Sequence, residues 1–285
     1  MSQWQMVERE ARDELGEGAC WSPRDQAFYW VDILAPALNR LSLGDGAITR
    51  WAMPEPLGWV VRRRSGGLIG GFQSGVAEID LDPVAIRAVV DPEPHLPANR
   101  MNDGKADAQG RIWFGTMDMA EQADSGALYR LDPDRNWTRL DHGYRVPNGP
   151  AFSHDGQWLY HSDTARRTIF RFTLGADGSV ADRVPFIHFA EEDGYPDGMT
   201  VDASGGLWVA HWGGNRISRF SPDGTLDRAI ALPARQITNL AFVGDRLDRL
   251  FVTSAAIGLP PSPYDGALFE VDAGTTGMAT NEFFG

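Results

Sequence analysis

The stretch "YPDGMTVDASGGLWVAHW", residues 195–212, decides the fold because its pattern recurs along the chain. It combines the turn signal Pro196-Asp197-Gly198, a short apolar segment, a second turn at Ser204-Gly205-Gly206 and an aromatic strand. Proline presets φ, and aspartate and glycine tolerate tight backbone geometry, so a turn position explains Asp197 when it is taken alone. A turn position does not explain why the whole pattern returns elsewhere.

The same order of turn, apolar strand, turn and aromatic strand occurs in "VPNGPAFSHDGQWLYHSD", which starts at Val146. Further copies start at Leu15, Met101 and Ile237, and a degenerate copy starts at Pro56. The anchor residues of the six copies are Glu17, Gly58, Asn102, Asn148, Asp197 and Asn239, at intervals of 41 to 49 residues. Repeats of this length are typical of radial β-sheet arrays. The sequence therefore predicts an all-β, six-bladed β-propeller with four-stranded antiparallel blades around a central channel, formed as a single domain over residues 1–285.

A circular array must be closed, because closure removes exposed sheet edges. The predicted closure pairs an N-terminal strand at residues 4–7 with the segment "GALFEVD", residues 266–272. Helices are expected to be absent, apart from one short helical turn near residues 83–90.

Composition narrows the function classes. The 285 residues carry a formal net charge of −13, which disfavours nucleic acid and anionic membranes as partners. Cys20 is the only cysteine, so an intrachain disulfide and a cysteine-rich metal site are excluded. No apolar run of about 18 residues occurs, and the N-terminal segment is charged, so we expect a cytoplasmic protein that does not bind membranes.

The anchors suggest a metal site. Equivalent positions of propeller blades lie on a ring around the axis, and the anchors include two carboxylates and three carboxamides. Such a ring would repel itself if buried and empty, whereas a divalent cation would relieve the repulsion. Glu17, Asn148 and Asp197 offer oxygen donors only, which suits Ca²⁺, Mg²⁺ or Mn²⁺. A water-filled polar tunnel is the alternative explanation.

Longer motifs connect these anchors with a known family. They are "LGEGACW" (15–21), "NRMNDGKADAQGRIWFGTM" (99–117), "GALYRLDP" (126–133), "VPNGPAFS" (146–153), "YPDGMTVDASGGLWVAHWGG" (195–214) and "GALFEVD". With them the chain resembles the SMP-30/gluconolactonase/regucalcin family of sugar-lactone lactonases over essentially its whole length. The bacterial pentose and hexose aldonolactonases are the most similar members.

The resemblance implies specific roles for individual residues. Glu17, Asn148 and Asp197 would bind one divalent metal ion, and Asp197 would also act as the general base. Calcium is the expected ion by ligand type, with Mg²⁺, Mn²⁺, Zn²⁺ and Fe²⁺ as alternatives. Arg100 and Asn102 would bind substrate.

A carboxylate on the loop after "GTM" would contact the sugar hydroxyls in the same family. The acidic positions of "GTMDMAEQADSG" are shifted in this chain, so Glu121 is the expected residue and Asp118 is the alternative.

Lactone chemistry is compatible with this set, since a lactone is an activated ester whose hydrolysis needs one Lewis acid, one base and one water. The lack of a side chain at Gly58 either leaves room for substrate or reflects a tight backbone position. Trp59 or Trp212 would form an apolar wall, and His211 is expected to pack rather than to bind.

The predicted function is metal-dependent hydrolysis of a sugar lactone to its aldonic acid, with a small-molecule substrate as partner. Two other functions stay open. The first is an organophosphatase or arylesterase of propeller type, and the second is a non-catalytic calcium-binding or interaction propeller. The sequence does not specify the sugar, the ring size or the oligomeric state.

Overall fold

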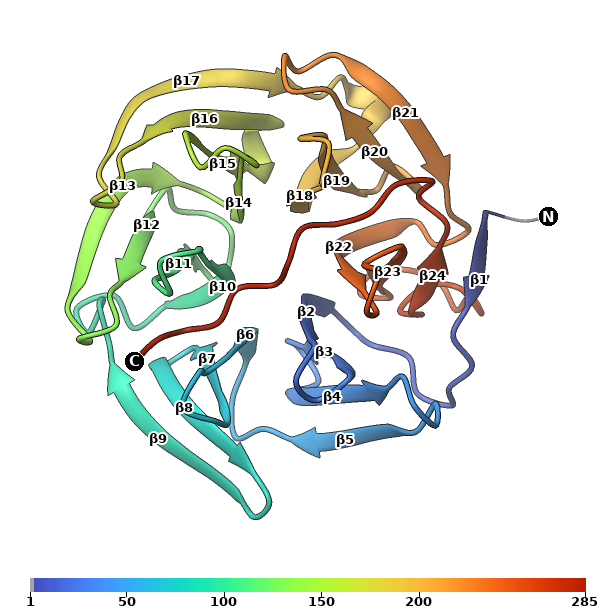
Figure 1. Ribbon diagram of the computed structural model, residues 1–285, viewed down its shortest axis with the longest axis horizontal. Helices are drawn as coiled ribbons and strands as arrows, with labels where there is room; N and C mark the ends of the chain where they lie inside the picture. The colour runs from blue at the N-terminus through green and yellow to red at the C-terminus, as the bar shows by residue number, and fades with distance from the viewer. Residues whose placement is uncertain (1–2) are drawn as a thin grey trace.

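The structure, a computed structural model, describes residues 3–285. Antiparallel sheets surround a central axis, and the first strand of each four-stranded sheet lies nearest that axis (Figure 1). Within the described range, the helices are two single turns of 3-10 helix, η1 (Thr164–Arg166) and η2 (Glu191–Asp193). No helix in that range is long and apolar enough to cross a membrane. The fold is therefore all-β and propeller-like.

Four of the sheets contain four strands each, in chain order. The first consists of β2 (Gly16–Ser22), β3 (Ala27–Asp32), β4 (Ala37–Ser42) and β5 (Ile48–Ala52). The second consists of β6 (Leu57–Arg62), β7 (Leu68–Phe72), β8 (Gly75–Leu81) and β9 (Val84–Val90). The third consists of β10 (Asn99–Ala106), β11 (Ile112–Asp118), β12 (Gly126–Leu131) and β13 (Trp137–Tyr144). The fourth consists of β14 (Pro147–Phe152), β15 (Trp158–Asp163), β16 (Thr168–Leu174) and β17 (Val180–His188).

The remaining sheet has eight strands. One half consists of β18 (Tyr195–Val201), β19 (Leu207–Trp212), β20 (Arg216–Phe220) and β21 (Leu226–Ala231). The other half consists of β22 (Gln236–Val243), β23 (Arg249–Ala255), β24 (Phe269–Val271) and β1 (Trp4–Met6). A single residue pair, Trp212 opposite Gln236, joins the halves. The strand pairing among the described residues thus gives five sheets, where the sequence predicted six separate ones.

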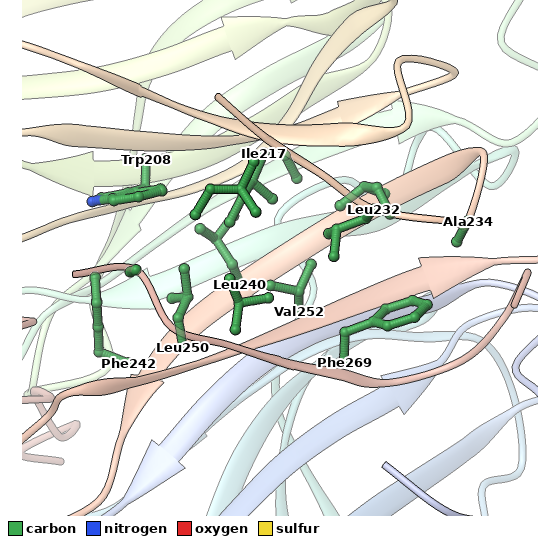
Figure 2. Packing of buried hydrophobic residues seen from close by; sticks show 14 of the residues in the cluster. Trp208, Ile217, Leu232, Ala234, Leu240, Phe242, Leu250, Val252 and Phe269 are labelled. Carbon is green, nitrogen blue, oxygen red and sulfur yellow. The ribbon is translucent and has the colours of Figure 1, made fainter. Parts of the chain in front are cut away.

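Apolar side chains fill the spaces between neighbouring sheets and hold the ring together. Figure 2 shows one such cluster, in which Trp208 and Ile217 of one half-sheet face Leu240 and Val252 of the other. All four side chains are fully buried. The second strands of the sheets are covered on both faces, and β3 and β11 are accordingly buried along their whole length and mostly apolar. Burial of this kind is the main force that positions the inner strands around the axis.

The expected helical turn near residues 83–90 was wrong. Those residues form strand β9, which pairs with β8 from Val76 opposite Val90 to Leu81 opposite Val84. The segment is rich in valine and isoleucine, whose branched side chains favour the pleated strand over a helix.

The predicted closure is confirmed. Strand β1 pairs antiparallel with β24, placing Trp4 opposite Val271 and Met6 opposite Phe269. The first described residues therefore complete the half-sheet formed by the end of the chain.

The chain beyond β24 crosses the face of the ring (Figure 1). This C-terminal strap, residues 272–285, bonds to several sheets: Ala203 N–H donates to Thr276 O, Asn281 Nδ2 to Ala106 O, and Phe284 N–H to Gly110 O. Residues 278–281 line a cavity whose other walls include Lys105 and Thr200, near the far ends of β10 and β18. The strap covers one end of the central channel.

Candidate functional site

The innermost strand of every sheet unit is interrupted at its anchor or directly after it. In β2, β6, β10, β14, β18 and β22 the pairing register shifts, which leaves one or two residues without a partner on the neighbouring strand. The unpaired residues are 18–19, 58, 102–103, 149–150, 197–198 and 238–239. A bulge of this kind re-aims side chains out of the ladder. Here it occurs once per repeat, beside the channel.

One cavity of about 400 Å³ brings the predicted residues together. Its walls include all six: Glu17, Arg100, Asn102, Glu121, Asn148 and Asp197. These residues come from four inner strands, β2, β10, β14 and β18, and from the loop after β11. The cavity lies at the end of the channel opposite the strap, because the strap faces residues further along the same inner strands.

A chain of hydrogen bonds fixes the polar wall formed by β10 and β14. Arg100 donates to Asn102 Oδ1 at 2.7 Å, and Asn102 Nδ2 donates to Asn148 Oδ1 at 3.1 Å. Asn148 Nδ2 in turn donates to Thr164 Oγ1 at 2.9 Å, whose hydroxyl donates to Pro196 O at 2.6 Å. These hydrogen bonds fix the amide orientation of Asn148, with its oxygen toward Asn102 and its nitrogen toward Thr164.

The carboxylates of Glu17 and Asp197 are buried, and the hydrogen bonds that they accept do not offset the cost of burying their charges. Burial raises the pKa of Glu17 to about 7, and the nearby charge of Asp103 adds to the effect. Burial also raises the pKa of Asp197 well above its usual range, with further contributions from Glu17 and Asp103. Asp197 Oδ1 has no hydrogen-bond partner among residues 3–285. A positive ligand placed between Glu17 and Asp197 would keep both carboxylates ionised.

Asp103 lies beside the cavity residues without lining the cavity, and sequence reasoning missed it. Its Oδ2 accepts hydrogen bonds from Asn239 Nδ2 at 3.3 Å and from Gly149 N–H at 3.1 Å, and Asn239 also donates to Glu17 Oε2 at 2.9 Å. Asp103 therefore links Glu17 to the backbone beside Asn148. The signal was present in "NDG", but one anchor was assigned to each repeat, whereas the β10 bulge releases two residues.

Lys105 lies on the strap side of Asp103, and its positive charge offsets the negative charge of that carboxylate. Burial lowers the pKa of Lys105, and the charge of Asp103 opposes that effect. The Lys105 ammonium also donates to the carbonyl oxygen of Met199 on β18. The channel thus carries a lysine behind its three acidic side chains, on the side of the strap.

The loop after β11 separates the two candidate carboxylates. Asp118 accepts backbone hydrogen bonds from Gln122 and Ala123, both at 3.0 Å, and it is absent from the cavity wall. Glu121 lies in the wall, on a backbone with φ of +56°. The left-handed conformation costs about 1 kcal/mol for a residue with a side chain. Asp118 therefore shapes the loop that presents Glu121.

Of the two tryptophans expected to form an apolar wall, only Trp212 lines the cavity. A side chain at Gly58 would lie 2.5 Å from the carbonyl oxygen of Asn102, so this glycine permits close backbone packing. Trp59 is fully buried in the core, away from the cavity. Trp212 does line the cavity, together with Tyr195, which lies opposite it on β18.

His211 packs as expected. Its ring lies 4.4 Å from that of Phe189, centroid to centroid, and its Nδ1 bonds to Asp193 O at 2.8 Å. It has no place in the cavity wall.

Comparison with known proteins gives the family. The model of the SMP-30/gluconolactonase/LRE-like region matches residues 15–256, which span every anchor. The chain belongs to this family.

Individual relatives within the SMP-30/gluconolactonase family are similar over nearly the whole chain. A 6-deoxy-6-sulfogluconolactonase from Pseudomonas putida is 36% identical, covering 95% of each chain. An L-arabinolactonase from Azospirillum brasilense is 37% identical, covering 97% of this chain and 94% of the relative. The crystal structure of regucalcin from Agrobacterium tumefaciens, described as a calcium-binding protein, superimposes with a TM-score of 0.93 at 29% identity, covering 98% of this chain and 96% of that chain.

The donor set is compatible with a metal ion of the hard type. Among residues 3–285, no cluster of three or more His, Cys, Asp or Glu side chains is arranged around a possible metal position. The candidate set instead combines two carboxylates with the carboxamide oxygen of Asn148. Oxygen-only donors of this kind suit Ca²⁺, Mg²⁺ or Mn²⁺ better than the softer transition metals.

Proposed function

We propose that this protein is a metal-dependent lactonase that hydrolyses a sugar lactone to the corresponding aldonic acid. The observation that carries the proposal is the unpartnered, buried Oδ1 of Asp197, which lies in a 400 Å³ cavity shared with Glu17 and Asn148. A buried carboxylate oxygen without a donor is costly unless a ligand satisfies it. The similarity to two proteins named as sugar lactonases supports the substrate class.

Glu17, Asn148 and Asp197 are the residues that would hold the divalent ion. When bound, the ion supplies positive charge for the carbonyl oxygen of the lactone, where negative charge develops during hydrolysis. The raised pKa values of Glu17 and Asp197 fit this assignment, since a cation favours the ionised form of both.

Asp197 is the proposed general base. It accepts a proton from the attacking water as the new bond to the lactone carbonyl carbon forms. The same proton then passes to the ring oxygen as the ester C–O bond breaks, which restores the carboxylate and leaves a hydroxy acid. Among the cavity carboxylates that the structure describes, Asp197 is the one with a buried oxygen that lacks a hydrogen-bond partner.

Arg100, Asn102 and Glu121 are proposed to bind the substrate hydroxyls. Arg100 already orients Asn102 through a 2.7 Å bond, so the two act as a preformed pair of polar contacts. Glu121 offers acceptors from the opposite loop, where its charge also opposes the lowering of the Arg100 pKa by burial. Together they supply both donors and acceptors to a polyhydroxylated ring.

We also propose that the chain forms one six-bladed domain. Support comes from the single residue pair that joins the halves of the eight-stranded sheet and from the bulge found in each of six inner strands. Apolar clusters fill the spaces between successive four-stranded units, including the space between the last unit and the first.

A pH-indicator assay tests the proposed function directly. Acid release from aldonolactones is followed with the metal-loaded protein, after removal of metal with EDTA, and after adding Ca²⁺, Mg²⁺ or Mn²⁺ back. We expect turnover that disappears with EDTA and returns with at least one ion. Ion binding without turnover of any sugar lactone would favour a binding protein, and full activity in protein shown to be metal-free by elemental analysis would exclude the metal role.

A further inference from the structure

A second arginine, Arg145, lies in the cavity wall, and neither the metal site nor the proposed hydroxyl contacts involve it. It precedes β14, the strand that carries Asn148, and its side chain is 45% exposed. This partial exposure places Arg145 toward the opening of the cavity, whereas Glu17 and Asp197 are buried at its inner end.

A closed ring of ion pairs holds Arg145 in place. Its Nε donates to Asp124 Oδ1 at 2.9 Å, and Arg166 donates to Asp124 Oδ2 at 2.7 Å. Arg166 also donates to the buried Asp163 at 2.8 Å, and Asp163 accepts the backbone N–H of Arg145 at 3.2 Å. Both the backbone and the side chain of Arg145 are therefore fixed before any ligand arrives.

The ring leaves the binding end of Arg145 free. Only Nε and the backbone N–H donate hydrogen bonds, so neither terminal guanidinium nitrogen has a partner among residues 3–285. Arg166 differs, since both of its terminal nitrogens donate to protein oxygens. A fixed guanidinium with two free terminal nitrogens matches an oxyanion, which can accept two parallel hydrogen bonds.

We propose that Arg145 selects sugar lactones that carry an oxyanion substituent, such as phosphate, sulfonate or carboxylate, remote from the reacting carbonyl. This inference rests on the proposed lactonase function. With the carbonyl beside Asp197 at the inner end of the cavity, the opposite end of the sugar lies toward the opening, where Arg145 stands. A neutral sugar offers only hydroxyl groups at that position, and these would form weaker hydrogen bonds with the two terminal nitrogens of Arg145.

The test compares two substrates that differ by one phosphoryl group, glucono-1,5-lactone and its 6-phosphate. In the parent protein we expect kcat/KM to favour the phosphorylated lactone. In Arg145→Gln that preference should fall by about 10- to 100-fold, the range for loss of a charge-assisted hydrogen bond. Arg145→Lys keeps the positive charge but not the two parallel N–H donors, and it should lose part of the preference.

Arg246→Gln is the matched control. It removes the same charge, and Arg246 is 84% exposed, pairs with Asp248 and lies outside the cavity. It should leave the preference within a factor of two of the parent value.

Three outcomes would each overturn a different proposal. Equal preference in the parent protein and both Arg145 variants, with lactones still hydrolysed, overturns only the role of Arg145. Weaker inhibition by gluconate in Arg145→Gln without loss of the phosphate preference would assign Arg145 to the product carboxylate and overturn the selection proposed here. No hydrolysis of either lactone by metal-loaded parent protein would overturn the lactonase function itself.

Discussion

Two buried aspartates in one hairpin behave in opposite ways. Asp197 and Asp202 lie at the start and just after the end of β18, and they are 4% and 0% exposed. Asp202 accepts hydrogen bonds from the Trp208 indole at 2.9 Å and from Arg219 Nε at 2.6 Å, besides backbone N–H groups. In the part of the chain that the structure describes, no group donates to Asp197 Oδ1.

Their acidities diverge accordingly. Burial alone would raise the pKa of Asp202, but the Arg219 side chain, the Gly206 N–H and the Trp208 indole lower it to about 2. The pKa of Asp197 rises instead, because burial and neighbouring carboxylates act on it without compensation. The same side chain is a structural element where the fold satisfies it and a reactive group where the fold does not.

The third sheet repeats the structural half of this comparison. Asp107 accepts from the Trp113 indole at 2.8 Å and from Arg111 Nε at 2.6 Å, with the same six-residue spacing between aspartate and tryptophan. The turn aspartate with its tryptophan and arginine partners is therefore a structural element that two of the sheet units share. The anchor position differs from sheet to sheet, as expected of positions that serve a ligand.

The largest expected effect is on the rate of Asp197→Asn. An amide cannot accept the proton of water, so the metal-loaded variant should lose about 10² to 10⁴ in rate. Its free energy of unfolding should not fall, because a buried charge near Glu17 is removed. Initial rates and urea titrations measure the two quantities, and retention of more than about a tenth of the rate would transfer the base role elsewhere.

The opposite pattern is expected for Asp202→Asn. The substitution leaves the Arg219 guanidinium without its buried partner, and we expect the free energy of unfolding to fall by about 2 to 4 kcal/mol. The rate per folded molecule should stay near that of the parent protein. A loss below about 0.5 kcal/mol in urea titrations would show that Asp202 is not a structural element.

The gain in stability on metal binding should also distinguish the site carboxylates from the turn aspartate Asp202. A divalent ion at about 100 times its Kd stabilises the protein by about 2.7 kcal/mol. We expect Asp202→Asn to retain this increment and Glu17→Gln to lose most of it, as followed by thermal melts with and without ion. An increment that survives in Glu17→Gln would place the ion elsewhere.

The smallest effect concerns pH. Because the pKa of Asp202 is about 2 in the folded protein and 3.8 ordinarily, its contribution to stability is fully present above about pH 4 and disappears as the pH falls toward 2. We expect about 1 to 2 kcal/mol of the difference between the parent protein and Asp202→Asn to vanish over that range. A difference that is constant from pH 5 to pH 2.5 would contradict the assignment.

The repeat pattern predicted the part of the structure that every sheet unit shares. Turn signals and aromatic strands at a regular spacing place the inner strands, and they brought Glu17, Asn148 and Asp197 to one cavity. The repeat spacing alone did not identify Asp103, because a bulge that frees two residues rather than one leaves the spacing unchanged.

Features that occur once in the chain were harder to predict. The choice between Asp118 and Glu121 depends on how one irregular loop folds over the cavity. The strap has no strand periodicity, and it is held by backbone contacts that come from distant sheets. The pairing of Trp212 with Gln236 depends on how closely two units approach one another.

The pairing of β1 with β24 sets an order of events during synthesis. Gln5 and Glu270 are 265 positions apart and bonded at 2.8 Å, so the ribosome must synthesise the whole segment between them before the ring can close. Until then Trp21 and Phe28 of the first sheet lack Phe251 and Leu268, the apolar residues that cover them in the finished protein. Such long-range closure is slow and exposes apolar surface meanwhile. The nascent chain is therefore most prone to aggregation just before its last strand emerges.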